Sequence, residues 1–272
     1  MRGAPEQRAV FERFAKKYEL LQADVMRRIE RSVCGCDYGA TSWTTLAEAR
    51  IIRDMLALEP RNRLLDVGSG SGWPGIYLAE KMGCDIAMVD LPRAGLRIAL
   101  DRAKADNIAG VGFASVADAA ALPFRSDWFD AIFHSDVLCC LTEKLAVLTS
   151  CRRVVRAGGK MVFSVILITP GLADAEYERA AVSGPPFIAA DGAYPDMLGQ
   201  AGWEITDHRD LTADYVKTVG HMLRQLESHA DEVGAVFGED DAAQERARRR
   251  AALDALEDGL LRRELFHVVP RA

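Results

Sequence analysis

The chain has 272 residues, and its 34 Lys and Arg against 40 Asp and Glu leave a formal net charge of -6 at pH 7. This length is typical of one large domain or two small ones, 49% apolar residues can build a sizeable core, and the acidic balance argues against a dedicated nucleic-acid binder. The longest strongly apolar stretch, 161–168, is too short to span a bilayer, and the charged start lacks the apolar core of a signal peptide. We therefore expect a cytoplasmic protein without membrane insertion.

The first 60 residues have the spacing of helices. Apolar residues recur every three or four positions from Val10 to Val25, and a second helical run covers about 45–58. Residues 34–43, between the two runs, are rich in turn-forming and aromatic residues, which indicates a loop.

From Arg63 onward, short apolar runs alternate with helical stretches. Runs that are continuously apolar are typical of parallel strands covered on both faces. The five runs of this kind are 64–67, 86–89, 111–116, 131–134 and 161–166. Two further strand candidates, 203–208 and 264–269, bring the number to seven. The pattern predicts an α/β protein with a doubly wound, mostly parallel sheet.

Two stretches interrupt this alternation late in the chain. Residues 170–202 contain the breakers Gly184, Pro185 and Pro186 and the pair Tyr194–Pro195, so we expect an irregular insertion there. A long helical segment, 212–262, then separates the last two strand candidates. It includes the basic run 246–250, which we interpret as a solvated helix face.

The six cysteines are expected to be reduced thiols, because none forms a C-x-x-C pair and a chain of this size needs no disulfides. The close pairs Cys34/Cys36 and Cys139/Cys140 leave binding of a soft, thiophilic atom open. We expect no structural zinc site, since no ligand pairs have the required spacing.

The segment 64–75 is the most informative, because a buried strand enters a glycine-rich turn and then a helix. Gly68, Gly70 and Gly72 permit positive φ and let a ligand approach the backbone at the carboxyl end of the strand. The next strand ends at Asp90, whose carboxylate can accept both hydrogen bonds of a ribose diol. The pattern predicts a pocket for an adenosine-containing ligand.

Two kinds of adenosine ligand are compatible with this loop. Residues 70–75 match the G-x-G-x-x-G fingerprint of dinucleotide-binding folds, in which the loop holds an anionic pyrophosphate. Asp66 would oppose a pyrophosphate but suits a ligand with positive charge near the loop, such as an ammonium or a sulfonium. Asp66 favours the cationic ligand, and an NAD(P)-dependent oxidoreductase stays as the alternative.

At these motifs the sequence resembles the class I S-adenosylmethionine-dependent methyltransferases, and the resemblance covers nearly the whole chain. The family's D-x-G-x-G-x-G motif corresponds to Asp66, Gly68, Gly70 and Gly72. The remaining matches are the acidic strand end at Asp90, Asp118 before an L-P-F turn at 122–124, the fourth strand at 129–136, and a turn similar to R-P-G-G at 156–159 with Ala157 in place of proline.

The resemblance implies a Rossmann-like methyltransferase fold whose seventh strand is antiparallel, with S-adenosyl-L-methionine as the cofactor. It implies a core at 61–272, with a substrate lid insertion at about 170–202 and the helical segment 212–262. Residues 1–60 would form an N-terminal helical cap and a cofactor-covering loop. Within the family, the chain is similar to the small-molecule branch with ubiquinone-biosynthesis-type, sarcosine and phosphoethanolamine methyltransferases, whose G-Y-x-S-like loop resembles 37–42.

The expected site follows from these matches, and its cofactor-binding residues are Tyr38, Ser42, Asp66, Gly68, Ser69, Gly70, Gly72, Asp90, Leu91, Asp118, Ala119 and His134. Methyl transfer from a sulfonium depends mainly on orientation, so a catalytic base is optional. His134 is either that base or a packed residue that moves no proton. Asp136 either binds a substrate ammonium or caps the next turn.

The acceptor is expected to be a small molecule methylated on O, N or C. The candidate substrate-binding residues are Tyr18, Trp43, Phe187, Tyr194 and His221. Aromatic side chains form the apolar walls of such sites, although Tyr18 also fits the core stripe of a helix. A non-catalytic S-adenosylmethionine-binding protein is a further alternative, and the sequence does not determine the oligomeric state.

Overall fold

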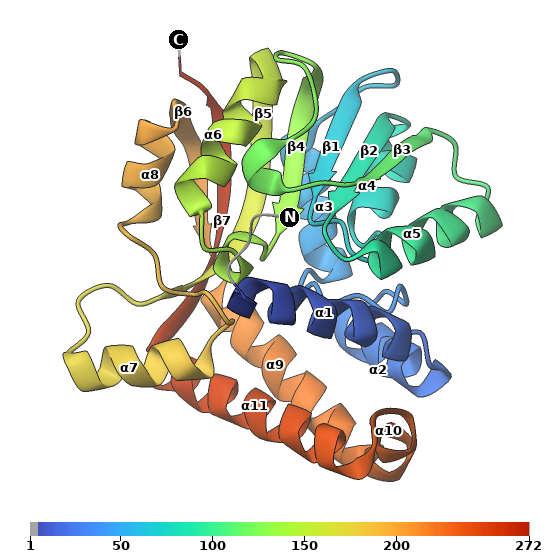
Figure 1. Ribbon diagram of the computed structural model, residues 1–272, viewed down its shortest axis with the longest axis vertical. Coiled ribbons are helices and arrows are strands. Elements are labelled where there is room, and N and C mark those ends of the chain that lie inside the picture. The colour runs from blue at the N-terminus through green and yellow to red at the C-terminus, as the bar shows by residue number, and fades with distance from the viewer. Residues whose placement is uncertain (1–4, 272) are drawn as a thin grey trace.

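A seven-stranded sheet runs through the molecule (Figure 1). The structure, a computed structural model, describes residues 5–271. The strand order is β3-β2-β1-β4-β5-β7-β6. Adjacent strands from β3 to β5 are parallel, and β7 is antiparallel to both β5 and β6. The strands are β1 (Arg63–Val67), β2 (Asp85–Asp90), β3 (Val111–Val116), β4 (Phe129–Ser135), β5 (Val155–Ile168), β6 (Trp203–Asp210) and β7 (Leu261–Pro270). The predicted fold class is confirmed.

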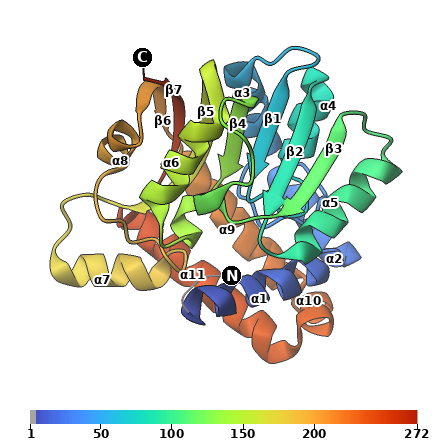
Figure 2. The ribbon, with the colours of Figure 1, turned by 45° about the horizontal axis from the view of Figure 1, so that its top comes forward.

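Helices cover both faces of the sheet. Side chains alternate between faces along each strand, so Leu64, Ile86 and Phe133 join one buried cluster while their neighbours Leu65 and Ile132 join another. The first cluster packs on α3 (Leu46–Leu56), α4 (Gly75–Met82) and α5 (Arg93–Ala105), and the second on α6 (Lys144–Val154) and α8 (Tyr194–Gln200). Figure 2 shows α6 in front of the sheet and α3 behind it.

A second group of helices gathers beyond the carboxyl ends of the parallel strands, below the sheet in Figures 1 and 2. The group consists of α1 (Pro5–Leu20), α2 (Asp24–Cys34), α7 (Asp174–Ser183), α9 (Thr212–Ser228), α10 (Ala230–Phe237) and α11 (Glu239–Glu257). A small apolar cluster that includes Ile29, Leu226 and Val233 joins α2 to α9 and α10. These helices enclose the edge of the sheet where a doubly wound fold binds its ligand.

Two local predictions were wrong. The apolar run from Val10 to Val25 forms two helices, which separate between Leu20 and Asp24. The segment 170–202, expected to be irregular, contains the two helices α7 (Asp174–Ser183) and α8 (Tyr194–Gln200). The pair Tyr194–Pro195 begins α8, because the first turn of a helix tolerates the missing N–H of proline. Within residues 5–271, no helix is both long and apolar enough to cross a membrane.

Candidate functional site

A cavity of about 1170 Å³ lies between the carboxyl edge of the sheet and the second group of helices. Its inner wall consists of the glycine loop after β1 and the end of β4. The other walls come from the loop segment 40–43, from α1, from the end of α7 and from α11. Segments that are distant in sequence therefore line the same cavity.

The glycine loop bends tightly over β1, and two positions in it require glycine. Gly68 and Gly70 have φ angles of 69° and 51°, a region that L side chains rarely adopt. A Cβ at Gly68 would lie 2.5 Å from Val137, and one at Gly70 would lie 2.9 Å from the hydroxyl of Tyr18. The loop thus exposes its backbone to the cavity while α1 approaches closely.

Asp90 is anchored beside this loop at the end of β2. Its Oδ2 accepts a hydrogen bond from the Gly70 amide at 2.7 Å and its Oδ1 accepts one from the Leu91 amide at 2.7 Å. The hydroxyl of Tyr18 also donates to Oδ2, at a longer 3.4 Å. Burial raises the pKa of Asp90 to about 6, although these hydrogen bonds oppose the shift. The carboxylate is therefore fixed in orientation by the two backbone amides, and the Tyr18 hydroxyl is its longest contact.

Asp66 lies on the cavity wall with a side-chain oxygen that lacks a partner. The residue is 2% exposed, and its Oδ2 accepts no hydrogen bond from any group in residues 5–271. Burial, followed by the charge of Asp90, raises its pKa well above the ordinary value. A buried acceptor without a partner is costly, so a ligand with a positive group or a donor at this point would relieve it. The site fits the amino and sulfonium groups of S-adenosylmethionine.

Asp136 lies on the same inner wall as the glycine loop, where β4 ends, with a φ of 54°. Its Oδ1 is 3.0 Å from Nε of Arg263 and accepts a hydrogen bond from Ser164 Oγ at 3.1 Å. Arg263 comes from β7 and is 1% exposed. It also donates to Oε1 of Glu48, on α3, at 2.6 Å. One guanidinium therefore orients both carboxylates, and the group of three has one net negative charge.

Serine and threonine hydroxyls connect the N-terminal loop to β4. Ser135 Oγ lies 2.9 Å from Ser42 Oγ and 2.7 Å from Thr44 Oγ1. Thr44 is in turn 3.4 Å from Nη2 of Arg263. The loop that forms one wall of the cavity is thus held by the same network that holds Asp136.

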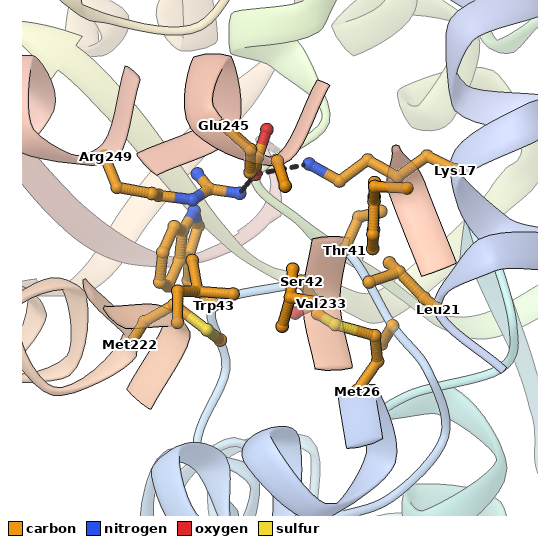
Figure 3. Close-up of a pocket in the computed structure, with 14 residues that line it drawn as sticks. Lys17, Leu21, Met26, Thr41, Ser42, Trp43, Met222, Val233, Glu245 and Arg249 are labelled. Carbon is orange, nitrogen blue, oxygen red and sulfur yellow. Dashed lines mark hydrogen bonds and ion pairs between the residues drawn. The ribbon is translucent and has the colours of Figure 1, made fainter. Parts of the chain in front are cut away.

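An ion-pair cluster joins α1 to α11 near the loop segment 40–43 (Figure 3). Glu245 Oε1 lies 2.8 Å from Nζ of Lys17 and 2.5 Å from Nη2 of Arg249. Burial opposes the negative charge of Glu245, but Arg249 and Lys17 together keep its pKa below the ordinary value. Arg249 also lies over the ring of Trp43, 4.7 Å from the centroid.

Behind this cluster is an apolar side pocket of about 50 Å³. Figure 3 shows Met26, Met222 and Val233 converging on it from three helices, with Ser42 and Trp43 at its border. The pocket shares the segment 40–43 and the ion-pair cluster with the larger cavity, so the two spaces are neighbours.

Several predicted site residues come together at the cavity. Those that line it are Ser42, Trp43, Asp66, Gly68, Ser69, Gly70 and Asp136. Tyr18, Asp90 and Leu91 lie directly behind the glycine loop and contact it or each other. The predicted roles of these residues stay predictions.

Other predicted residues lie farther from the cavity. Tyr38 stacks on Trp73 with centroids 5.2 Å apart, and Gly72 packs against α4 and α5. Asp118 is exposed and caps the short turn after β3, with Ala119 buried beside it. Their proposed cofactor contacts stay predictions.

The structure also places three predicted substrate-binding residues elsewhere. The backbone carbonyl of Phe187 accepts a hydrogen bond from the side chain of Lys144. Tyr194 is 4% exposed and packs near Phe266 in the core, which fits a structural role on α8. His221 lies on α9, 3.4 Å from Ser32 Oγ.

His134 points to the wrong face of the sheet for a base. Phe133 and Ser135 line the cavity, and strand alternation turns the side chain between them to the opposite face. There His134 is 0% exposed and stacks on Phe163 with ring centroids 4.6 Å apart. Burial lowers its pKa to about 3, and neither ring nitrogen has a partner within residues 5–271. The geometry favours packing over proton transfer.

The sequence did not reveal Ser135 or Arg263 as site residues. Arg263 is far from β4 in sequence, and only the antiparallel pairing of β5 with β7 brings it near Asp136. The basic run 246–250, interpreted as solvated, also contributes Arg248 and Arg249 to the cavity wall. Its proximity to a helix with Lys17 and Glu12 had no local sequence signal.

Comparisons with known proteins show a similarity to methyltransferases. A family model described as a methyltransferase domain matches residues 65–163. A phosphoethanolamine N-methyltransferase of Triticum aestivum is 29% identical over 188 residues, which cover 69% of this chain and 37% of that protein. A 27-O-demethylrifamycin SV methyltransferase of Amycolatopsis mediterranei is 32% identical over 163 residues, which cover 58% of this chain and 60% of that protein. The chain thus spans less than two thirds of the length of either relative.

A solved structure extends the likeness to the whole fold. The crystal structure of the cyclase SpnF has a TM-score of 0.76 and 21% identity, over 99% of this chain and 97% of that chain. Residues 65–163 are thus similar to a methyltransferase domain, and the sheet topology and the glycine loop agree with that similarity. Since a protein named as a cyclase shares the fold, activity has to be argued from the site.

We expect the variant Arg263→Met to lose about 3–5 kcal/mol of unfolding free energy, because it leaves Asp136 and Glu48 buried without their cation. Urea denaturation measures this loss. The control is Arg250→Met, since the side chain of Arg250 is 55% exposed and pairs with Glu227 at the surface, where such pairs contribute about 0–1 kcal/mol. Equal losses in both variants would contradict the central position of Arg263.

Proposed function

We propose that the protein transfers a methyl group from S-adenosyl-L-methionine to O, N or C of a small-molecule acceptor. The observation that supports this most directly is the unpartnered carboxylate oxygen of Asp66 in the cavity wall, beside the glycine loop. An acidic group at this point opposes a pyrophosphate and favours a cationic ligand. The proposal therefore ranks above a nicotinamide-dependent oxidoreductase.

The residues at the glycine loop would bind and orient the cofactor. Asp90, fixed by two backbone amides, would accept hydrogen bonds from the ribose hydroxyls in place of the Tyr18 hydroxyl. Asp66 would face the positive end of the cofactor, whose sulfonium supplies an electrophilic methyl group. Accurate orientation of the reacting groups can lower the barrier by up to about 7–11 kcal/mol.

Residues at the end of β4 would receive the acceptor. Ser135 and Asp136 lie on the cavity wall, and Arg263 holds the Asp136 carboxylate in one orientation. Asp136 would bind a donor group of the acceptor, either a hydroxyl or an ammonium. His134 would contribute packing alone.

The helices around the cavity would exclude water and admit the acceptor. In this proposal, the helical cap with its cofactor-covering loop is 1–60 and the core is 61–272; residues 1–4 and 272 of these ranges lie outside the described residues. The insertion at about 170–202 and the helical segment 212–262 complete the lid. A lid of this kind must open for product release. The ion pair between Lys17 on α1 and Glu245 on α11 is a contact that would break on opening.

Titration of the purified protein with S-adenosylhomocysteine and, separately, with NADH tests the proposal. Calorimetry should detect saturable binding of the first ligand alone. Acceptors that include phenols, quinols and amines are then incubated with S-adenosylmethionine, and mass spectrometry identifies the one that gains a methyl group. Binding of NADH alone would overturn the proposal, and cofactor binding without transfer to any acceptor would favour the non-catalytic alternative.

Affinity for S-adenosylhomocysteine should fall as the pH falls through about 6. The pKa of Asp90 is raised to about 6, so its carboxylate becomes protonated below this pH and accepts ribose hydrogen bonds less well. At one pH unit below that pKa, affinity should be about tenfold weaker than at pH 7.5. Calorimetry at both pH values measures the change. The variant Asp90→Asn should bind weakly at both, and a retained pH dependence in it would assign the titration to another group.

The variant His134→Phe should keep methyl transfer within about twofold of the wild-type rate, because the side chain lies on the opposite face of the sheet from the cavity. The matched variant Asp136→Asn should lower kcat by about tenfold or more. Steady-state assays with the identified acceptor compare the two. A large loss of kcat in His134→Phe at unchanged cofactor affinity would restore His134 as the base.

A further inference from the structure

The cavity is larger than methyl transfer to a very small acceptor requires. Pockets that enclose one drug-sized ligand have volumes of roughly 300–1,000 Å³, and this cavity has about 1170 Å³. The cofactor would occupy the end next to the glycine loop. The volume that is left can hold a second ligand of similar size.

One side of this outer part is made of small or apolar side chains. Ile166 and Leu261 form its floor at the ends of β5 and β7, and the loop after α7 contributes Pro185 and Pro186. Val182, at the rim, is 86% exposed. Apolar walls of this kind bind the body of an organic ligand and exclude water.

Helix α11 widens the outer part through its small residues. Ala247, Ala251 and Ala252 line the cavity, and their spacing of four and five positions puts them on one face of the helix. Alanine at these positions leaves the helix surface open where a larger side chain would fill the space. The neighbouring helix α7 contacts α11. Arg179 of α7 also forms an ion pair with Asp258, the residue that follows α11.

Polar groups are concentrated at two places in the remaining volume. Ser135 and Asp136 lie at the inner end, where the acceptor atom would meet the methyl group. The wall between α1 and α11 is polar and carries charges of both signs, from Glu12, Arg13, Lys16, Lys17, Asp241, Gln244, Glu245, Arg248 and Arg249. A ligand with an apolar body on one side and polar substituents toward this wall matches the distribution.

We propose that the acceptor is a bulky, mostly apolar organic molecule comparable in size to the cofactor, with its apolar body against α7 and the alanine face of α11. This proposal rests on the proposed methyl transfer. A small polar acceptor would contact the inner residues alone and leave the outer chamber filled with water, so the apolar walls would not orient it.

The test uses the neutral, rigid fluorophore 1-aminoanthracene as the probe, added to the full chain saturated with S-adenosylhomocysteine. The wild-type protein should bind one probe molecule, with a rise in fluorescence. Ala251→Trp fills the outer chamber and should weaken probe binding by about tenfold or more. The control Ala235→Trp puts the same side chain on an exposed position of α10 that does not line the cavity, and it should leave probe binding within about twofold.

The affinity for S-adenosylhomocysteine, measured in each variant, separates the possible failures. Unchanged cofactor affinity in Ala251→Trp shows that the variant is folded, and Ala247→Trp provides a second filled chamber. If the wild-type protein does not bind S-adenosylhomocysteine, the proposed function itself is overturned. Cofactor binding without probe binding, or equal probe binding by Ala251→Trp and Ala235→Trp, would overturn the proposed bulky acceptor and leave the proposed methyl transfer in place.

Discussion

The buried guanidinium of Arg263 is the interaction on which the acceptor side of the site depends. It contacts Asp136 after β4 and Glu48 on α3, and Glu48 also accepts a hydrogen bond from the Thr45 amide in the capping box that begins α3. The last strand thereby fixes both the N-terminal helices and the end of β4. Breaking such a buried pair is costly, and pairs of this kind are retained where they specify one geometry. Here that geometry puts a carboxylate on the cavity wall.

Strand alternation sets the second constraint. Asp66, Asp90 and Ser135 belong to the strand positions that share one face, and each of them lies at or near the carboxyl end of its strand. The glycine loop then crosses this edge, so two carboxylates and an open backbone surround one end of a single space. Tyr18 reaches the same place from α1 and donates a long hydrogen bond to Asp90. The same alternation turns His134 into the core, although it lies only two residues before Asp136.

The sequence predicted the parts of the molecule that depend on local pattern. The seven strands follow from continuous apolar runs, and the glycine loop with Asp66 and Asp90 follows from short spacings along the chain. The acceptor side depends on long-range packing instead, so the predictions there were poorer. Tyr194 lies in the core because α8 packs on the face away from the cavity, and Arg263 reaches Asp136 only through the pairing of β7 with β5. Likewise, a basic run on α11 borders the cavity because α11 crosses near α1.

The most direct test of this site is a crystal structure of the protein with S-adenosylhomocysteine. We expect the ribose hydroxyls within hydrogen-bonding distance of the Asp90 carboxylate, with the Tyr18 hydroxyl displaced from Oδ2. The amino-acid end of the ligand should lie beside Asp66 and the sulfur should face Ser135 and Asp136 across the cavity. A ligand bound outside the glycine loop, or with its sulfur turned away from the end of β4, would contradict the proposed transfer site.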